Sequence, residues 1–190
     1  MKMKKLLFAC LSVLFLISTA NAGILPFGIY TGIRGGIGIA KKESNIFDDA
    51  KIETNNSPFV SINAGIRLSD IRIEAEYLYK NSLKEIKIGN SSKNISPTSI
   101  LANVYYNFID IPFVKLYLNG GLGYTDLRTN YVEDDKKFTY SLGLGATFTL
   151  LDIIAIDAGY RYINMGKEEI GGYKHNFYTN DLYVGLRFGF

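Results

Sequence analysis

Histidine and cysteine, the usual catalytic base and thiol nucleophile, are scarce in this 190-residue chain. There is one histidine, His175, and one cysteine, Cys10. Nucleophilic catalysis needs a serine or cysteine beside a base, and a third group that orients the base. Asp181 is close enough in sequence to orient His175, but no serine lies beside the histidine. We therefore expect a solvated histidine and no catalytic residues.

The same shortage argues against a metal centre or a bound cofactor. A zinc site takes several histidine, cysteine or carboxylate ligands, and beyond His175 the chain offers scattered carboxylates. The glycines around Gly120-Gly121 lack the Lys-Ser/Thr pair and the following helix of a phosphate loop. The acidic runs Asp48-Asp49 and Glu133-Asp134-Asp135 do not have the spacing of a known calcium loop. Calcium binding by a loop stays an open alternative, and we expect no cofactor.

Charged side chains do recur at a regular spacing of two residues. Arg72, Glu74 and Glu76 alternate with isoleucine, alanine and tyrosine. This period places the charges on one face of a β-strand and is incompatible with a helix. Charges of both signs on one face either line an ion path or pair with one another, and we favour pairing. The expected network comprises Arg34, Arg67, Arg72, Glu74, Glu76, Lys115, Asp157, Arg161, Asp181 and Arg187.

Eight alternating runs position these charges. The runs span 29–39, 60–68, 71–80, 100–108, 114–124, 138–150, 154–162 and 182–190. Their connections alternate in length. The short ones are Ser69-Asp70, Asp110-Ile111-Pro112 and Leu151-Asp152, and the long ones span roughly 41–58, 81–97, 128–137 and 166–178. Successive hairpins with this alternation place the short turns at one end and the long loops at the other.

Eight antiparallel strands that close on themselves leave no exposed edge. The polar faces here are rich in glycine, which weakens a water-facing strand but makes room for long side chains in a narrow interior. The apolar faces carry aromatic residues towards their ends, as the interfacial girdles of membrane barrels do. We therefore predict an all-β, eight-stranded antiparallel up-and-down transmembrane β-barrel whose apolar side chains face lipid.

Residues 1–22 have the features of a secretory signal peptide. Three lysines within the first five residues precede an apolar run, and Ala20-Asn21-Ala22 supplies a small-x-small cleavage site. Without this segment the chain has 18 basic and 18 acidic side chains, so its charge does not favour nucleic-acid binding. The expected organisation is a cleaved signal peptide, 1–22, followed by a barrel domain, 23–190.

The last eight residues match the carboxy-terminal signal of outer-membrane barrels. The residues that carry this match are Tyr183, Gly185, Phe188 and Phe190. Together with residues 72–77 and 159–166, which look like its third and seventh strands, they resemble the small OmpA-like and opacity-type outer-membrane barrel family. The resemblance implies the outer membrane of a Gram-negative bacterium as location, and recognition of the last strand by the barrel assembly machinery.

We expect the long loops to contain the residues that bind a ligand. They carry mixed charge and aromatic residues such as Phe47, Tyr131 and Phe177, and binding residues concentrate on loops held by a rigid scaffold. We expect a monomeric surface protein in contact with outer-membrane lipid and lipopolysaccharide. The resemblance implies an adhesion or immune-evasion role, with a host or surface ligand bound by the loops. The alternative is a narrow pore or a lipid-modifying barrel enzyme, although the related deacylases have serine where this chain has Phe177.

Overall fold

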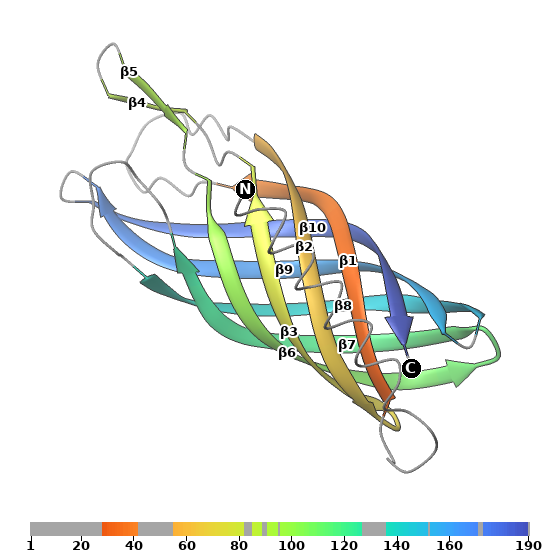
Figure 1. The fold of residues 1–190 in the computed structure, drawn as a ribbon. Coiled ribbons are helices and arrows are strands. Elements are labelled where there is room, and N and C mark those ends of the chain that lie inside the picture. The colour runs from red at the N-terminus through yellow and green to blue at the C-terminus, as the bar shows by residue number, and fades with distance from the viewer. Residues whose placement is uncertain are drawn as a thin grey trace, which may run out of the picture.

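The computed structural model describes residues 28–41, 55–81, 85–88, 91–94, 96–126, 136–151, 153–170 and 173–189. The strands within these ranges are β1 Gly28–Lys41, β2 Asn55–Leu68, β3 Ile71–Lys80, β4 Glu85–Ile88, β5 Ser91–Asn94, β6 Thr98–Ile111, β7 Val114–Asp126, β8 Lys136–Leu151, β9 Ile154–Ile170 and β10 Tyr173–Gly189. Eight of them form a closed antiparallel barrel in the order β1-β10-β9-β8-β7-β6-β3-β2, and β4 and β5 form a separate hairpin (Figure 1). No helix in the described ranges is long and apolar enough to cross a membrane.

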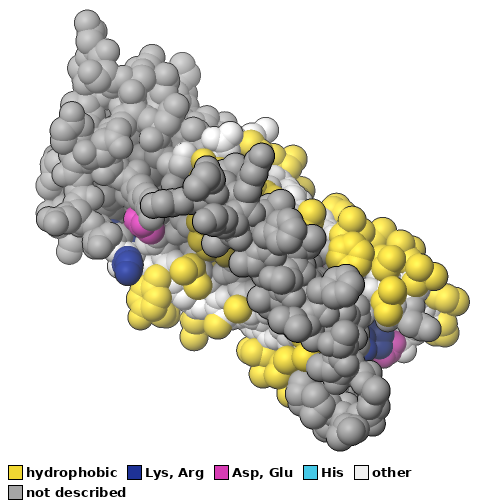
Figure 2. All heavy atoms as spheres, viewed as in Figure 1, with side chains coloured by type: hydrophobic (Ala, Val, Ile, Leu, Met, Phe, Trp, Pro, Cys, Tyr) yellow, Lys and Arg dark blue, Asp and Glu magenta, His cyan; other side chains and the backbone are white. Residues whose placement is uncertain are grey.

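Side chains alternate between the lumen and the outer face of the barrel because successive residues of a strand point to opposite sides. In β3 every second residue is buried, from Arg72 to Lys80. The residues between them, such as Ile73 and Tyr77, are exposed on the outside. Figure 2 shows hydrophobic side chains over the outer face of the described part, and the charged side chains visible there lie towards its two ends. The predicted eight-stranded barrel with apolar side chains outward is confirmed.

The barrel closes through a long pairing between the first and last strands. β1 and β10 are antiparallel partners from Tyr30 opposite Gly189 to Lys41 opposite Tyr178. This seam satisfies the backbone donors and acceptors of both strands, which hydrocarbon could not hydrogen-bond.

Inward tyrosines lie over glycines on the neighbouring strand. Tyr117 on β7 is paired with Gly145 on β8, and a β-carbon at Gly145 would lie 2.5 Å from the Tyr117 hydroxyl. Tyr183 on β10 is paired in the same way with Gly159 on β9, where an added β-carbon would lie 2.7 Å from the phenol. The glycines therefore make room for rings that fill the lumen.

The turns at one end follow the prediction with two shifts, one of which concerns Leu151-Asp152: Leu151 still belongs to β8, and β9 begins at Ile154. Ser69 and Asp70 join β2 to β3, as expected. The turn expected at Asp110-Ile111-Pro112 instead uses Pro112 and Phe113, because a bulge between Asn107 and Ile109 adds a residue to β6. Pro112 has no backbone N–H and cannot extend the ladder, and Phe113 has a left-handed φ of 70°.

The prediction of a long loop at 166–178 is wrong. β9 continues to Ile170 and β10 begins at Tyr173, so that Glu168 faces His175 within one extended hairpin. Polar residues occupy both faces of this segment, so its sequence lacks the apolar alternation by which a strand is predicted. The ladder continues because backbone pairing needs no apolar face. The segment 81–97 likewise contains the β4-β5 hairpin, in which Glu85 pairs with Asn94.

Leu144 tests the orientation of the barrel, because it lies near the middle of β8 and is 56 % exposed on the outer face. Leu144→Arg places a charge in hydrocarbon and is expected to lower the free energy of unfolding by about 2–4 kcal/mol, measured by urea titration of the lipid-embedded protein. Leu151→Arg is the matched control at the turn end of the same strand, where the cost falls to about 0–1 kcal/mol. Equal losses for the two variants would contradict a lipid-facing outer surface.

Candidate functional site

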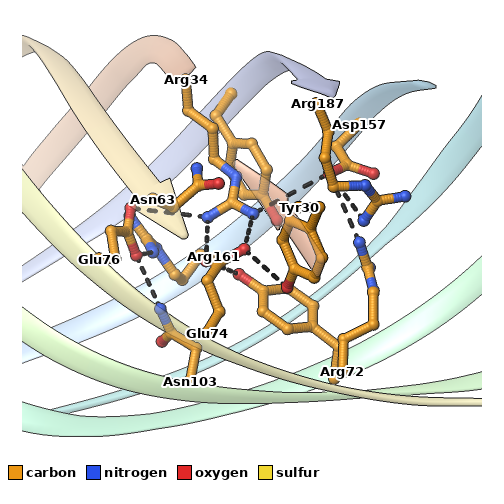
Figure 3. Close-up of polar contacts among 12 residues, drawn as sticks. Tyr30, Arg34, Asn63, Arg72, Glu74, Glu76, Asn103, Asp157, Arg161 and Arg187 are labelled. Atoms are coloured by element: carbon orange, nitrogen blue, oxygen red, sulfur yellow. Dashed lines mark hydrogen bonds and ion pairs between the residues drawn. The ribbon is translucent and has the colours of Figure 1, made fainter. Parts of the chain in front are cut away.

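The lumen holds a network of charged side chains from β1, β3, β9 and β10 (Figure 3). Arg34 on β1 and Glu74 on β3 form its most direct ion pair. Both guanidinium Nη atoms of Arg34 donate to the Glu74 carboxylate, at 2.7 Å each. The phenols of Tyr30 and Tyr105 also donate to Glu74, at 3.2 and 3.1 Å. A buried charge is costly unless it is paired and hydrogen-bonded, and Glu74 has both.

Glu76 joins opposite walls of the barrel. Its Oε2 accepts hydrogen bonds from Arg161 Nη1 at 2.6 Å and from Asn103 Nδ2 at 2.9 Å. Arg161 belongs to β9 and Glu76 to β3, which are four strands apart in either direction around the eight-stranded barrel. This ion pair therefore spans the full width of the lumen.

Asp157 on β9 is shared by several arginines. Its Oδ2 lies 3.3 Å from Arg187 Nη1, 3.6 Å from Arg72 Nη1 and 3.9 Å from Arg34 Nη2. Its Oδ1 accepts a hydrogen bond from Thr147 at 2.6 Å. One carboxylate thus partly neutralises two guanidiniums, Arg72 and Arg187, that have no other ion pair with a described residue.

Lys80 forms a separate pair nearer the long-loop end. Its Nζ donates to Asp181 Oδ1 at 2.5 Å and to Thr179 at 3.0 Å, and it lies 4.7 Å from the centre of the Phe59 ring. The apolar residues around this level are Phe59, Leu78, Leu101, Ile163, Met165 and Tyr183. The sequence places Lys80 on the charged face, but the expected network did not include it. No sequence signal indicates that β3 and β10 approach each other across the lumen.

Two of the ten expected network residues lie outside the buried part. Arg67 is exposed at the end of β2, and Lys115 is partly exposed and pairs with Asp110 beside a short turn. Both residues follow the two-residue period, but they lie at the barrel mouth, where water solvates their charges. The other eight are brought together in the lumen: Arg34, Arg72, Glu74, Glu76, Asp157, Arg161, Asp181 and Arg187.

Tyrosines make up a part of the site that the sequence analysis missed. The Tyr105 and Tyr117 rings meet edge to face, with centroids 5.4 Å apart, and Arg72 lies over both. The Tyr117 and Tyr183 hydroxyls are 2.9 Å apart. An inward tyrosine between asparagine or glycine residues was the available signal, because a phenol fits a lumen where its hydroxyl finds a partner. The arrangement holds every carboxylate close to a cation and has the properties of a structural core.

The assembly residues expected from the carboxy-terminal motif fall on both faces of β10. Tyr183 is buried in the lumen, and Gly185 lies beneath Arg34, where a β-carbon would be 2.6 Å from Arg34 Cγ. Phe188 is exposed on the outside. Phe190 lies outside the described residues. The inward members of the motif therefore also have a packing role in the folded barrel.

The remaining candidates from the sequence analysis are the histidine, the acidic runs and the aromatic loop residues. His175 lies in β10 opposite Glu168, and the calcium candidates at 48–49 and 133–135 lie outside the described residues. Phe47 and Tyr131 lie there too. Within the described ranges, no group of three or more histidine, cysteine, aspartate or glutamate side chains could hold a metal ion.

Comparison with known families agrees with this geometry. Residues 8–190 match the family described as "Outer membrane protein beta-barrel domain". The chain belongs to this family. As a member of it, the protein is an outer-membrane β-barrel of a Gram-negative bacterium. The resemblance inferred from the strand and carboxy-terminal motifs is confirmed at the level of the family.

Individual relatives are more distant. Outer membrane protein PagN of Salmonella typhimurium is 27 % identical over 126 residues, which cover 53 % of each chain, so the match spans about half of that relative. Among solved structures, Neisserial surface protein A has a TM-score of 0.60 and 22 % identity, with 88 % of this chain and 99 % of that chain covered. Outer membrane protein H of P. aeruginosa has a TM-score of 0.52 and 18 % identity, with 85 % and 99 % covered. The two structures support the fold.

In the Arg34–Glu74 pair, each buried charge is expected to offset the desolvation cost of the other and so to stabilise the folded barrel. Arg34→Met and Glu74→Gln each leave one buried charge without its partner and are expected to cost about 3–5 kcal/mol of unfolding free energy. The double variant should lose about 1–3 kcal/mol less than the sum of the two. Denaturant unfolding in micelles measures all three. Lys115→Met and Asp110→Asn form the exposed control pair, for which each change should cost about 0–1 kcal/mol; equal effects in both pairs would contradict a buried network.

Proposed function

We propose that this protein is a non-catalytic surface protein that acts through the long-loop end of its barrel, in an adhesion or immune-evasion type of role. The observation that carries the proposal is the packing of the lumen. Eight strands enclose an interior just wide enough for side chains, and here Arg72, Arg161, Tyr105 and Tyr117 are less than 2 % exposed within it. A lumen filled in this way leaves the ends of the barrel as the surfaces available for recognition.

The structure also extends beyond the barrel at the long-loop end. The β4-β5 hairpin projects from that end, and the extended β9-β10 hairpin also ends there (Figure 1). Backbone pairing restricts the conformations of both segments, which lowers the entropy lost when a partner binds. These two extensions are the proposed contacts with a host or surface ligand.

The apolar outer face accounts for the remaining partners. A belt of exposed leucine, isoleucine and aromatic side chains fits outer-membrane lipid, with lipopolysaccharide as the lipid at the long-loop end. Closure of the β1-β10 seam leaves no strand edge in the barrel for pairing with a second copy, which supports a monomer. Export would rely on the signal peptide at 1–22, which lies outside the described residues.

Trimming the projecting segments tests the proposed surface role. Bacteria that produce the intact protein should adhere to an epithelial monolayer or survive in serum better than bacteria with an empty vector. Replacement of 82–95 and 167–176 by Asn-Gly turns should abolish that gain, because the proposed contacts are removed while the barrel seam is kept. A heat-dependent shift on a detergent gel should show that the variant still folds.

The matched control replaces Ser69-Asp70 by Asn-Gly at the opposite end and should keep the full gain. Two results would overturn the proposal. One is an intact protein that confers no gain, or a trimmed variant that keeps it. The other is stepwise conductance of the purified barrel across a planar bilayer, which would indicate the alternative of a narrow pore.

The carboxy-terminal residue tests recognition by the barrel assembly machinery. Deletion of Phe190 should reduce the amount of folded barrel in the outer membrane several-fold, measured by the heat-dependent gel shift of membrane fractions. The same purified variant should refold in detergent micelles as well as the intact chain does, because the deletion keeps every residue of the described β1-β10 seam. Poor refolding in micelles would instead indicate a structural role for Phe190.

A further inference from the structure

A small cavity opens at the short-turn end of the lumen, away from the proposed ligand surface. Its volume is about 40 Å³, which is more than the roughly 10–15 Å³ that one water needs. Among the described residues that line it, four are basic and none is acidic: the basic residues are Arg67, Arg72, Lys115 and Arg187. The cavity therefore combines room for a small guest with a strong preference for negative charge.

Arg72 is the unusual member of this group. It is 1 % exposed, and none of its three guanidinium nitrogens makes a hydrogen bond. The guanidinium stacks against Tyr105 and Tyr117, with distances of 4.5 and 5.0 Å to the ring centres, and its ion pair with Asp157 is 3.6 Å long. Buried polar groups are hydrogen-bonded in most native structures because an unsatisfied donor is costly. Five buried N–H groups without an acceptor indicate that an acceptor is missing.

The charges around the cavity do not balance. Arg187 and Arg72 share Asp157, and the buried Nη1 of Arg187 also lacks a hydrogen bond. Arg67 makes no ion pair with another described residue. Lys115 is paired with Asp110. Among the described residues, Asp157 and Asp110 are thus the two carboxylates that form ion pairs with any of these four cations.

Neutral groups complete the lining. Thr149 and Asn107 lie in the cavity wall, and hydroxyl and amide groups donate hydrogen bonds to anions. Guanidinium groups present paired N–H donors whose geometry matches phosphate oxygens. We propose that the cavity lined by Arg67, Arg72 and Arg187 is a binding site for a phosphate-type oxyanion, entered from the short-turn side of the barrel.

Two sources can supply this chemistry. Short turns of outer-membrane barrels face the periplasm, where free phosphate reaches the mouth from solution. The turn end also carries exposed Leu151, Ile153 and Phe113, which lie near the headgroups of the inner leaflet. The bound group is therefore either inorganic phosphate or the phosphodiester of a phospholipid.

Titration of the folded barrel with inorganic phosphate tests the site. In chloride-free buffer and neutral detergent, the arginine side-chain N–H signals of Arg72 and Arg187 should shift saturably in NMR spectra. Arg187→Gln and Arg67→Gln should each weaken the apparent affinity about tenfold, because each removes a charge-assisted contact. Arg67 is exposed, so Arg67→Gln should fold and can still test the proposal if Arg187→Gln does not fold.

Lys136→Gln is the matched control. It removes one positive charge from an exposed residue at the other end of the barrel, and it should leave the affinity unchanged. No saturable shift in the intact protein, or equal weakening by Lys136→Gln, would overturn the proposal, since the effect would then reflect net charge alone.

Nanodiscs distinguish the two sources. In discs that contain phosphatidylglycerol, occupation by a lipid headgroup should shift the Arg72 signals before any phosphate is added and block the response to free phosphate. Occupation by free phosphate should instead preserve the titration seen in detergent. Arg72 signals that respond to neither source would overturn the site.

Discussion

Charge pairing across the lumen is the constraint on which the rest of this barrel depends. Glu76 and Arg161 come from opposite walls and meet at 2.6 Å, and Glu74 binds both Nη atoms of Arg34 within the same layer. An ion in the lumen has lost most of its water, so a pair of this kind is strongly destabilised when one partner is removed. Each pair requires a particular stagger of its strands, because a shift of two residues would keep the charges in the lumen but separate the partners. The polar interior thereby specifies the register that the apolar outer face alone would leave free.

The two ends of the barrel differ because of this interior. Towards the long loops, Lys80 lies against Phe59 and forms an ion pair with Asp181. Towards the short turns, Asp157 is surrounded by more guanidiniums than it can neutralise. The lumen therefore has a balanced end and an electropositive end. The projecting hairpins stand at the balanced end, so the excess positive charge of the lumen lies at the end opposite to them.

Much of this fold could be predicted from the sequence. The two faces of a barrel wall meet different surroundings, lipid outside and a polar lumen inside, and successive side chains of a strand alternate between them. Arg72, Glu74 and Glu76 showed both the strand and its inward face. Pairing partners could not be predicted in this way, since the approach of Lys80 to Asp181 depends on closure and shear. The extension of β9 and β10 was missed because Lys167, Glu168 and Glu169 follow one another in sequence and leave no apolar alternation there. Arg67 and Lys115 follow the same two-residue alternation, but they lie at the mouth of the barrel, where water surrounds their charges.

The β1-β10 seam also sets the order of folding events. Tyr30 pairs with Gly189, so nearly the whole chain separates the partners that close the barrel. Contacts between distant segments carry a large loop-closure entropy and form slowly, whereas each neighbouring hairpin can form locally. Until the seam forms, β1 and β10 expose unpaired backbone, which is a template for aggregation. The open sheet is therefore the vulnerable species of this protein, and its lifetime is governed by how quickly the two ends of the chain find each other.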